Sequence, residues 1–284
     1  MMQSFSEALR TKVKHINNSD ESSPRGIKVR EELLATMAIN PIDCIADFKN
    51  RAFNFKYFAG ELAWYLNKDR DVSYINKFSN FWQHIVNPGT NEINSNYGSL
   101  VFNEQLEWVI EQLRKDPNSR QAIMFFNRPD FQFEGNKDFV CTMYANFFIR
   151  NNKLNMKLQM RSNDVFYGLT FDAPFFSFLH QSIYLILKDT MPDLELGTYY
   201  HYADNMHFYE RHFELANNII DQGVGTQYNF VLNKKMIDIV DGKYSLTEIG
   251  QSFIDQCNDI VGDKEKHLVK RNYQDLLGKF FNLG

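Results

Sequence analysis

The chain has 284 residues, three cysteines and a net charge of −4 with interspersed charges, which suits a self-sufficient globular core without a disulfide framework or zinc site. No basic block marks a polymeric nucleic-acid partner. With neither a secretory signal nor the roughly 20 apolar residues that span a bilayer, we expect a cytoplasmic protein without membrane contacts.

The first half of the chain predicts helices joined by polar loops. Residues 18–26 are turn-rich and predict a loop after an N-terminal helix. Residues 55–67 have apolar side chains at helical spacing, with Glu61 as the only acid. After the Asn-, Gly- and Pro-rich loop 86–98, residues 102–115 carry the apolar stripe of an amphipathic helix with one buried face.

The second half predicts a sheet and further helices. Asn151 and Asn152 suit a tight hairpin turn between two apolar runs. Strands followed by helices, without regular βαβ alternation, favour an α+β fold with a mixed sheet. No repeat or linker divides the chain, so we expect one domain over 1–284, with a helical extension from about 235. The predicted strands are 121–127, 139–150, 153–160 and 198–203, and the predicted helices are 175–187, 206–220 and charged amphipathic helices within the last forty residues.

Cys141 precedes by twenty residues the polar, glycine-bearing segment RSNDVFYGLTFD at 161–172. A cysteine inside an apolar strand is more often a small buried hydrophobe than a nucleophile. A reactive thiol needs an electropositive neighbour that favours the thiolate. Arg161, on the strand that returns from the predicted hairpin turn, is the candidate for that neighbour.

Several short motifs resemble those of the thymidylate synthases in order and approximate spacing. They are PNSRQ at 117–121, DFVCT at 138–142, the 161–172 segment and HFY at 207–209, with shorter matches around Arg25 and Glu61 and at 81–82 and 96–98. Within this family the strings EINSNYG, NKDFVCT and MRSNDV are most similar to the phage deoxycytidylate hydroxymethylases. The resemblance runs from about Arg25 to about Ala216 and implies a thymidylate synthase-like fold and a homodimer formed through the sheet.

The resemblance also implies a reaction. The Cys141 thiolate would add to C6 of the pyrimidine of dCMP, C5 would take a one-carbon unit from the reduced folate 5,10-methylenetetrahydrofolate, and water would complete 5-hydroxymethyl-dCMP and release tetrahydrofolate. No metal is implied. The phosphate would be held by Arg25, Arg161 and Ser162, with Arg120 donated by the partner subunit, because guanidinium groups bind phosphate bidentately.

The remaining implied contacts surround the sugar, the base and the folate. His207 and Tyr209 would reach the 3′-hydroxyl, although their local pattern alone indicates the surface of an amphipathic helix. Synthases carry a second arginine beside the one at Arg120; here Gln121 makes the phosphate site less cationic or shifts the task to Arg128. The other implied roles are proton and water handling by Glu61, a place beside the cysteine for Tyr97, substrate binding by Asn163, and folate binding by Trp82, Asp164, Gly168 and Phe171.

Asp172 stands where a synthase carries asparagine. An amide matches the N3–H donor and O4 acceptor of uracil, whereas a carboxylate accepts from the N4 amino group of cytosine, and from N3 once it is protonated. A carboxylate facing O4 costs about 1–3 kcal/mol. The sequence therefore predicts dCMP over dUMP. The alternative is that Asp172 caps a helix starting near Ala173, with Pro174 in the first turn.

Several functions stay open at this point. One is a thymidylate synthase or a dUMP hydroxymethylase with an unusual base reader, another is a ribonucleotide (CMP) hydroxymethylase, and a third is a catalytically silent nucleotide-binding dimer. The sequence separates neither a methyl from a hydroxymethyl product nor a role for the C-terminal helices. A phage-encoded enzyme of this kind would act in the host cytoplasm, in nucleotide biosynthesis and DNA modification.

Overall fold

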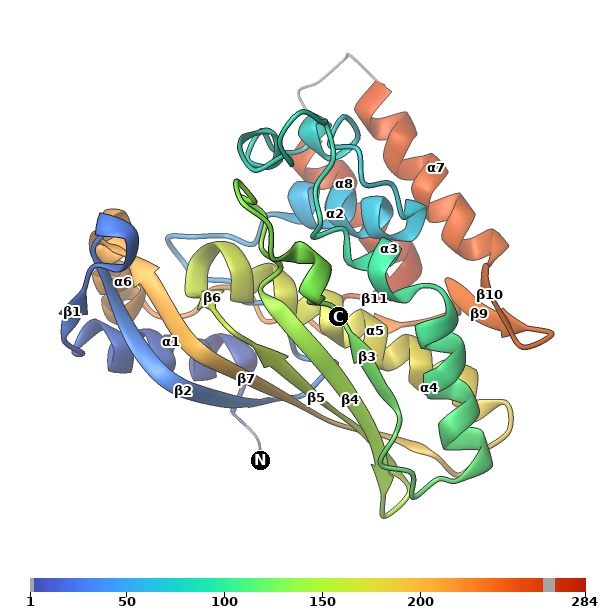
Figure 1. Cartoon of the computed structure of the whole chain (residues 1–284). Helices are drawn as coiled ribbons and strands as arrows, with labels where there is room; N and C mark the ends of the chain where they lie inside the picture. Colours follow the sequence, from blue (N-terminus) through green and yellow to red (C-terminus); the bar gives the residue numbers. More distant parts are fainter. Residues whose placement is uncertain (1–2, 263–268) are drawn as a thin grey trace.

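The computed structural model describes residues 3–262 and 269–284. Its helices alternate with strands along the chain without a regular βαβ repeat (Figure 1). The helices are α1 (Phe5–Asn17), α2 (Phe55–Asn67), α3 (Tyr97–Val101), α4 (Glu104–Lys115), α5 (Thr170–Lys188), α6 (Phe213–Gln222), α7 (Glu248–Gly262) and α8 (Val269–Phe280). The strands are β1 (Glu21–Ser22), β2 (Val29–Ile39), β3 (Ile123–Phe125), β4 (Thr142–Arg150), β5 (Lys153–Met160), β6 (Asn163–Asp164), β7 (Glu195–Tyr209), β8 (Val231–Leu232), β9 (Ile237–Val240), β10 (Lys243–Leu246) and β11 (Phe281–Asn282).

One mixed sheet organises the fold. Its strands lie in the order β1-β2-β7-β5-β4-β3, with β6 added beside β7. β7 runs parallel to β5 and β6, and the other neighbours are antiparallel. Asn151 and Asn152, with φ of 53° and 57°, form the tight turn between β4 and β5, as a two-residue hairpin requires. The predicted α+β class and mixed sheet are confirmed.

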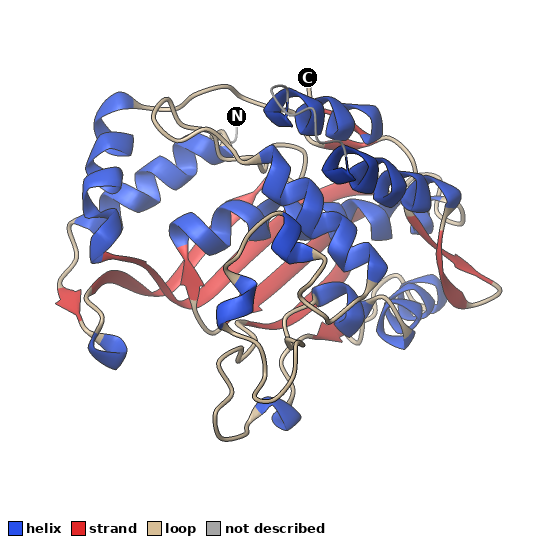
Figure 2. Ribbon diagram, turned by 90° about the horizontal axis from the view of Figure 1, so that it is seen from above, coloured by secondary structure: helices blue, strands red, loops and turns tan. Residues whose placement is uncertain are grey.

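The helices cover one face of this sheet (Figure 2). α5 is apolar on nearly all sides and packs in the core, where most of its residues are buried. Side chains alternate along β7, with Tyr199, His201 and Ala203 buried beneath the helices and Tyr200 and Tyr202 on the other face. That second face carries an aromatic surface, in which Phe148 stacks on Tyr200 and Lys157 lies between the rings of Tyr144 and Tyr202.

Some predicted boundaries were wrong around the segment 206–220. β7 continues to Tyr209, and the helix begins only at Phe213. His207 and Tyr209 therefore lie on a strand rather than on a helix surface. The short run MHFY fits either period, and pairing with β2 on one side and β6 on the other decides for the strand.

Two differences affect the predicted centre directly. Cys141 lies just before β4 rather than inside a strand, next to an irregularity in the β4–β5 register. α5 begins at Thr170, directly after a π-helix at Val165–Leu169, and not near Ala173. Pro174 favours a helix start close to it, but here it lies inside a helix that the preceding π-turn has already begun.

The C-terminal region also differs from the prediction of helices alone. The hairpin β9–β10 precedes α7 and α8, and β11 pairs with β8. Residues 263–268, within the predicted helical stretch, lie outside the described residues. The predicted strand 121–127 is shorter in the structure, where it is β3. On the edge of β3 away from β4, the Phe125 N–H donates to Gln105 Oε1 at 2.8 Å, and Gln105 Nε2 donates to the Phe125 carbonyl at 2.9 Å.

Candidate active site

Cys141 and Arg161 meet at the ends of the β4–β5 hairpin. The Arg161 backbone N–H donates to the Cys141 carbonyl at 2.9 Å, and Nη2 lies 3.5 Å from Sγ. The same guanidinium donates to the carbonyl oxygens of Phe139 and Val140, which fixes its direction. Burial raises the pKa of Cys141, Arg161 opposes that rise, and Asp172 adds to it. Arg161 therefore supplies the cation that a thiolate needs.

The Asp172 carboxylate ends a hydrogen-bond chain of defined direction. Asn163 Nδ2 donates to Asp172 Oδ2 at 2.8 Å, Asn163 Oδ1 lies 3.1 Å from His201 Nε2, and His201 Nδ1 lies 2.7 Å from the Tyr199 hydroxyl. An ionised carboxylate only accepts, so Asn163 must present its carbonyl to an Nε2–H of His201. Burial lowers the pKa of His201 to about 3, so the ring is neutral and Nδ1 accepts from Tyr199.

Asp172 itself keeps contact with solvent at one side, although protein surrounds most of its carboxyl group. Burial raises its pKa to about 6, with Asn163 opposing and Asp164 adding to the rise, so it is mainly ionised at neutral pH. Oδ1 accepts no hydrogen bond from any described residue. The first residue before α5, Leu169, makes no side-chain cap, and Asp172 does not cap the helix either. The capping alternative is therefore wrong.

Gly168 makes room for this chain. A Cβ at Gly168 would lie 2.7 Å from Asn163 Nδ2 and 3.2 Å from Asp172 Oδ2. The missing side chain thus permits the Asn163–Asp172 contact, a role beside the predicted folate contact of Gly168. Neither Tyr199 nor His201 was singled out from the sequence. Their spacing of two, which places both on one face of a strand, was the available signal.

Three residues predicted separately form one cluster around Tyr57. Its hydroxyl donates to Glu61 Oε1 at 2.6 Å and accepts from Trp82 Nε1 at 3.1 Å, and its ring meets that of Phe171 edge-on at 4.7 Å. Sequence reasoning missed Tyr57, although it lies one helical turn before Glu61. Burial raises the pKa of Glu61 to about 8, with Tyr57 opposing and Asp172 adding to the rise. Glu61 is therefore a proton donor at neutral pH.

Replacing Glu61 with glutamine is expected to flatten the pH dependence of folding stability. The folded protein holds this proton up to about pH 8, whereas the unfolded chain releases it near the ordinary pKa of 4.5. Because the folded state binds more protons between these values, wild-type stability falls as the pH rises through the window, by about 1.4 kcal/mol for each unit of pKa difference. Urea unfolding near both ends of the window measures this. Equal losses in wild type and variant would contradict a buried, protonated Glu61.

His207 is oriented by two neighbours at the end of β7. Asn205 donates through Nδ2 to Glu31, so its Oδ1, 2.9 Å from His207 Nδ1, must accept from that nitrogen. Burial lowers the pKa of His207, which leaves Nε2 of the neutral ring as an acceptor for a hydroxyl group. Tyr209 packs edge-on against His207 at 5.2 Å.

Asp164 faces His207 across the β6–β7 pair. Its Oδ1 accepts from the N–H groups of Phe166 at 2.7 Å and Tyr167 at 2.8 Å. Its buried Oδ2 has no hydrogen-bond partner among the described residues. Asp164 thus lies beside His207, one of the predicted sugar-binding residues. Trp82, the residue predicted to bind the folate together with Asp164, lies in the cluster around Tyr57.

The predicted phosphate residues are only partly gathered. Arg25, on an exposed turn with φ of 56°, is close enough for its charge to lower the pKa of both Cys141 and His207. Ser162 follows Arg161 directly. Arg120 is exposed, and the β3–β4 register places it beside the C-terminal end of β4, whereas Cys141 lies at the N-terminal end of that strand. Gln121 is exposed as well. Arg128 donates to the Leu100 carbonyl at 3.1 Å, and its part in phosphate binding stays a prediction.

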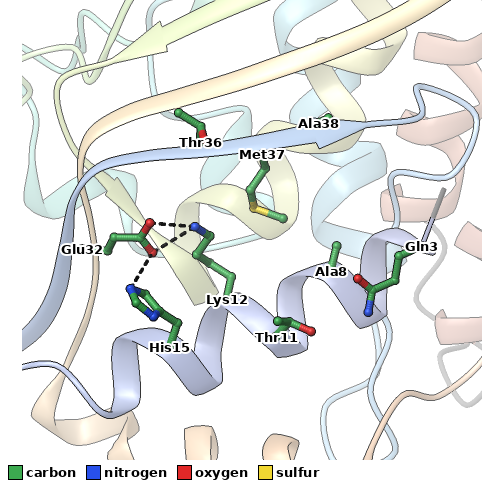
Figure 3. Close-up of a pocket in the computed structure, with 9 residues that line it drawn as sticks. All are labelled: Gln3, Ala8, Thr11, Lys12, His15, Glu32, Thr36, Met37 and Ala38. Carbon is green, nitrogen blue, oxygen red and sulfur yellow. Dashed lines mark hydrogen bonds and ion pairs between the residues drawn. The ribbon is translucent and has the colours of Figure 1, made fainter.

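A pocket of about 410 Å³ lies elsewhere, between α1 and β2 (Figure 3). Lys12 Nζ is paired with both Glu32 oxygens, at 2.8 and 2.9 Å. None of the lining residues is a predicted site residue. Within residues 3–262 and 269–284, no cluster of three or more His, Cys, Asp or Glu could hold a metal ion, and no helix combines the length and apolarity needed to cross a bilayer.

Comparison with known proteins agrees with this geometry. The family model described as thymidylate synthase matches residues 14–251. The chain belongs to the thymidylate synthase family. Family members are folate-dependent one-carbon transferases acting on pyrimidine nucleotides, and this enzyme uses methylenetetrahydrofolate as co-substrate. The predicted family, fold and class of enzyme are confirmed.

Individual relatives in the family differ in the base on which they act. The chain is 33% identical over 178 residues to the deoxycytidylate 5-hydroxymethyltransferase of Enterobacteria phage T4, covering 59% of this chain and 72% of the relative. It is 29% identical over 211 residues to the deoxyuridylate hydroxymethyltransferase of Bacillus phage SP01, covering 68% and 54%. It is 30% identical over 171 residues to a thymidylate synthase of Buchnera aphidicola, covering 56% and 62%.

Proposed function

We propose that this family member is a deoxycytidylate 5-hydroxymethyltransferase, which forms 5-hydroxymethyl-dCMP and tetrahydrofolate. The observation that carries the proposal is the hydrogen-bond chain from Tyr199 through His201 and Asn163, which ends at the Asp172 carboxylate. It holds one oxygen of Asp172 on Asn163 and leaves Oδ1 as an acceptor. An acceptor at that place suits the N4 amino group of cytosine and opposes the O4 atom of uracil.

The residues of the site divide the proposed reaction among them. Sγ of Cys141, held beside Arg161, forms the bond to C6, and the electron pair of the C5–C6 double bond becomes available at C5 for the folate methylene group. Asp172 accepts from N4, and from N3 when it is protonated. The C5 proton then leaves as the bond between the methylene carbon and the folate nitrogen breaks, which releases tetrahydrofolate and leaves an exocyclic methylene group at C5. Hydroxide from water adds to that methylene carbon, and the Sγ–C6 bond breaks as the C5–C6 double bond re-forms. Glu61, which carries a proton at neutral pH, lies within electrostatic reach of Asp172 to exchange protons at the base.

The runner-up substrate is dUMP. One relative is a deoxyuridylate hydroxymethyltransferase at 29% identity, so family membership alone leaves the base open. Asp172 is the residue that favours cytosine. For the sugar, the proposed roles of His207 and Tyr209 extend to the 3′-hydroxyl, which dCMP and CMP share, and the deoxyribose preference follows from the T4 relative only.

The proposal includes a homodimer formed through the open sheet face. Its support is the aromatic surface of Tyr144, Phe148, Tyr200 and Tyr202 around Lys157, since large exposed apolar faces mark interaction sites. The place of Arg120, far along β4 from Cys141 in its own chain, fits donation to the partner's phosphate site. A monomeric mass by sedimentation at micromolar concentration would contradict this part.

We also propose that the C-terminal helices belong to one catalytic domain with the rest of the chain. α7 and α8 contact α2, which carries Glu61. Tyr273, Leu276 and Leu277 of α8 are buried, and Tyr273 meets Phe78 edge-on at 6.0 Å. Their role on this proposal is to support α2 from its far side.

Weighing the product of the purified enzyme tests the function. With dCMP and methylenetetrahydrofolate, we expect a nucleotide heavier by one CH₂O unit and no rise in the absorbance that accompanies folate oxidation. dUMP should react at least about 10-fold more slowly, the ratio that corresponds to one mismatched polar contact. A methylated product with dihydrofolate, or faster turnover of dUMP, would overturn the proposal.

A further inference from the structure

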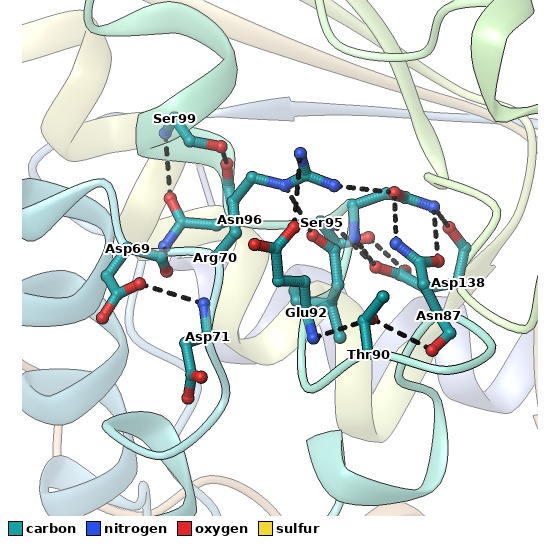
Figure 4. Close-up of polar contacts among 12 residues, drawn as sticks. Asp69, Arg70, Asp71, Asn87, Thr90, Glu92, Ser95, Asn96, Ser99 and Asp138 are labelled. Carbon is teal, nitrogen blue, oxygen red and sulfur yellow. Dashed lines mark hydrogen bonds and ion pairs between the residues drawn. The ribbon is translucent and has the colours of Figure 1, made fainter.

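Asp138 lies three residues before Cys141, in a loop, and is only 6% exposed. Its Oδ2 accepts from the backbone N–H groups of Asn94 at 2.6 Å and Ser95 at 2.7 Å, and its Oδ1 accepts from the Ser95 hydroxyl (Figure 4). In return, Asn94 Nδ2 donates to the Asp138 carbonyl at 2.9 Å. Four hydrogen bonds thus join this one residue to the pair 94–95.

A second tether lies on the other side of the nucleophile. The Thr142 hydroxyl donates to the Tyr97 hydroxyl at 2.8 Å. Cys141 is therefore placed between two anchors, Asp138 and Thr142, and both attach to the same short segment, 94–97.

That segment is in turn fixed to α2. Asn96 caps α3 by accepting from the Ser99 N–H at 2.9 Å, and its Nδ2 donates to the carbonyls of Trp64 at 3.1 Å and Asp69 at 2.8 Å. Tyr97 stacks on Tyr65, with 5.3 Å between ring centroids, and Tyr65 lies one helical turn after Glu61. The contacts run continuously from the thiol loop to the helix that carries the proton donor.

We propose that Asp138 is a positioning residue that holds Cys141 in register with Tyr97 and Glu61. The inference rests on the proposed function, in which Cys141 is the nucleophile. A carboxylate suits the task because its two oxygens accept three hydrogen bonds, whereas an amide in its place turns an NH₂ group toward one of the donors.

The negative charge of Asp138 works against the reaction, so its electrostatic effect and its positioning effect can be told apart. It adds to the rise in the pKa of Cys141, so it disfavours the thiolate. Burial also raises the pKa of Asp138 itself, and the hydrogen bonds from Ser95 and Asn94 oppose that rise. Loss of the Asp138 charge should therefore lower the pKa of the Cys141 thiol, which favours the thiolate. Loss of the hydrogen bonds to Asn94 and Ser95 should nevertheless lower kcat.

Asp138→Asn tests this prediction, with turnover and the pH dependence of Cys141 alkylation by iodoacetamide as readouts. We expect the thiol pKa to fall and kcat to fall by about 100-fold, the scale for a catalytic group displaced by about 1 Å. KM for dCMP should change less than kcat, because Asp138 makes no hydrogen bond to Arg25 or Asp172 and meets Arg161 only through the neighbouring carbonyl oxygens of Phe139 and Val140. The matched control Asp130→Asn removes an exposed carboxylate from the preceding turn and should leave both readouts unchanged.

Ser95→Ala keeps the test decisive if the first variant does not fold. It removes only the hydroxyl donor, so kcat should fall by a smaller factor while the thiol pKa and KM stay at wild-type values. Unchanged kcat in either folded variant would overturn the positioning role. A wild-type enzyme that turns over neither dCMP nor dUMP would refute the proposed function and this inference together, whereas an active wild type with an equally active Asp138→Asn would refute the inference alone.

Discussion

Replacing Cys141 with serine should abolish turnover while leaving the binding of dCMP intact. A serine hydroxyl stays protonated beside Arg161, so no nucleophile adds to C6 and the covalent route is lost. Losing a nucleophile lowers kcat by on the order of 10⁴-fold or more. Arg25, Arg161 and Asp172 are unchanged by this substitution, so calorimetry should give a Kd for dCMP within a few-fold of wild type.

Two results would contradict this expectation. Turnover above about one per cent of wild type would remove Cys141 from the covalent step. Loss of dCMP binding together with activity would show that the substitution disturbs the site as a whole. The matched control is Cys257→Ser, which replaces a buried thiol on α7, away from the site.

Mixed dimers extend the same prediction to Arg120. An Arg120→Ala subunit keeps its own Cys141, and a Cys141→Ser subunit keeps its own Arg120. If Arg120 crosses the interface, each dimer that contains one subunit of each kind has one complete site, and mixing two inactive variants should restore up to about a quarter of the wild-type rate at equal amounts and random pairing. No recovery, in a mixture shown to exchange subunits, would place Arg120 in the site of its own chain or outside it.

The sequence could predict those parts of the site whose residues lie close together along the chain. The hairpin that joins Cys141 to Arg161 is local: two asparagines set the turn, and the alternating runs set the register. The helix over 55–67 was equally local. By contrast, nothing within reach of Asp138 in the sequence points to Asn94 and Ser95, because those contacts join loops whose approach depends on the whole fold.

The predicted start of the helix 206–220 was wrong for the same physical reason, whereas its second half is present as α6. Four residues, MHFY, suit a strand only because β2 and β6 flank them, and tertiary pairing overrides local period in short runs. The correction has a functional consequence. On a strand, Asn205 and His207 lie on the same face, so Asn205, which donates to Glu31, can accept from His207 Nδ1 and fix the proton there. On a helix, residues two apart would point to different faces.

Replacing Asp172 with asparagine should reverse the base preference. In the wild type Asn163 Nδ2 donates to Asp172, and we expect the variant to keep this direction, because reversing it would require a change of tautomer at His201 and a turn of the Tyr199 hydroxyl. The new amide must therefore turn its oxygen to Asn163 and its NH₂ group to the place of Oδ1. A donor there suits O4 of uracil and opposes N4 of cytosine.

We expect kcat/KM for dCMP to fall by about 10- to 100-fold, and that for dUMP to rise, which corresponds to about 1–3 kcal/mol for a reversed polar contact. The pH profile adds a second measurement. Because burial raises the pKa of Asp172 to about 6, the wild-type kcat/KM for dCMP should decline below about pH 6 as the carboxylate is protonated, and the variant should lack that limb with dUMP. Asp189→Asn, at the exposed far end of α5, controls for the loss of one negative charge. An Asp172→Asn enzyme that still prefers dCMP by the wild-type ratio would show that the base is read elsewhere, since an amide whose oxygen accepts from Asn163 presents only its NH₂ group to the base.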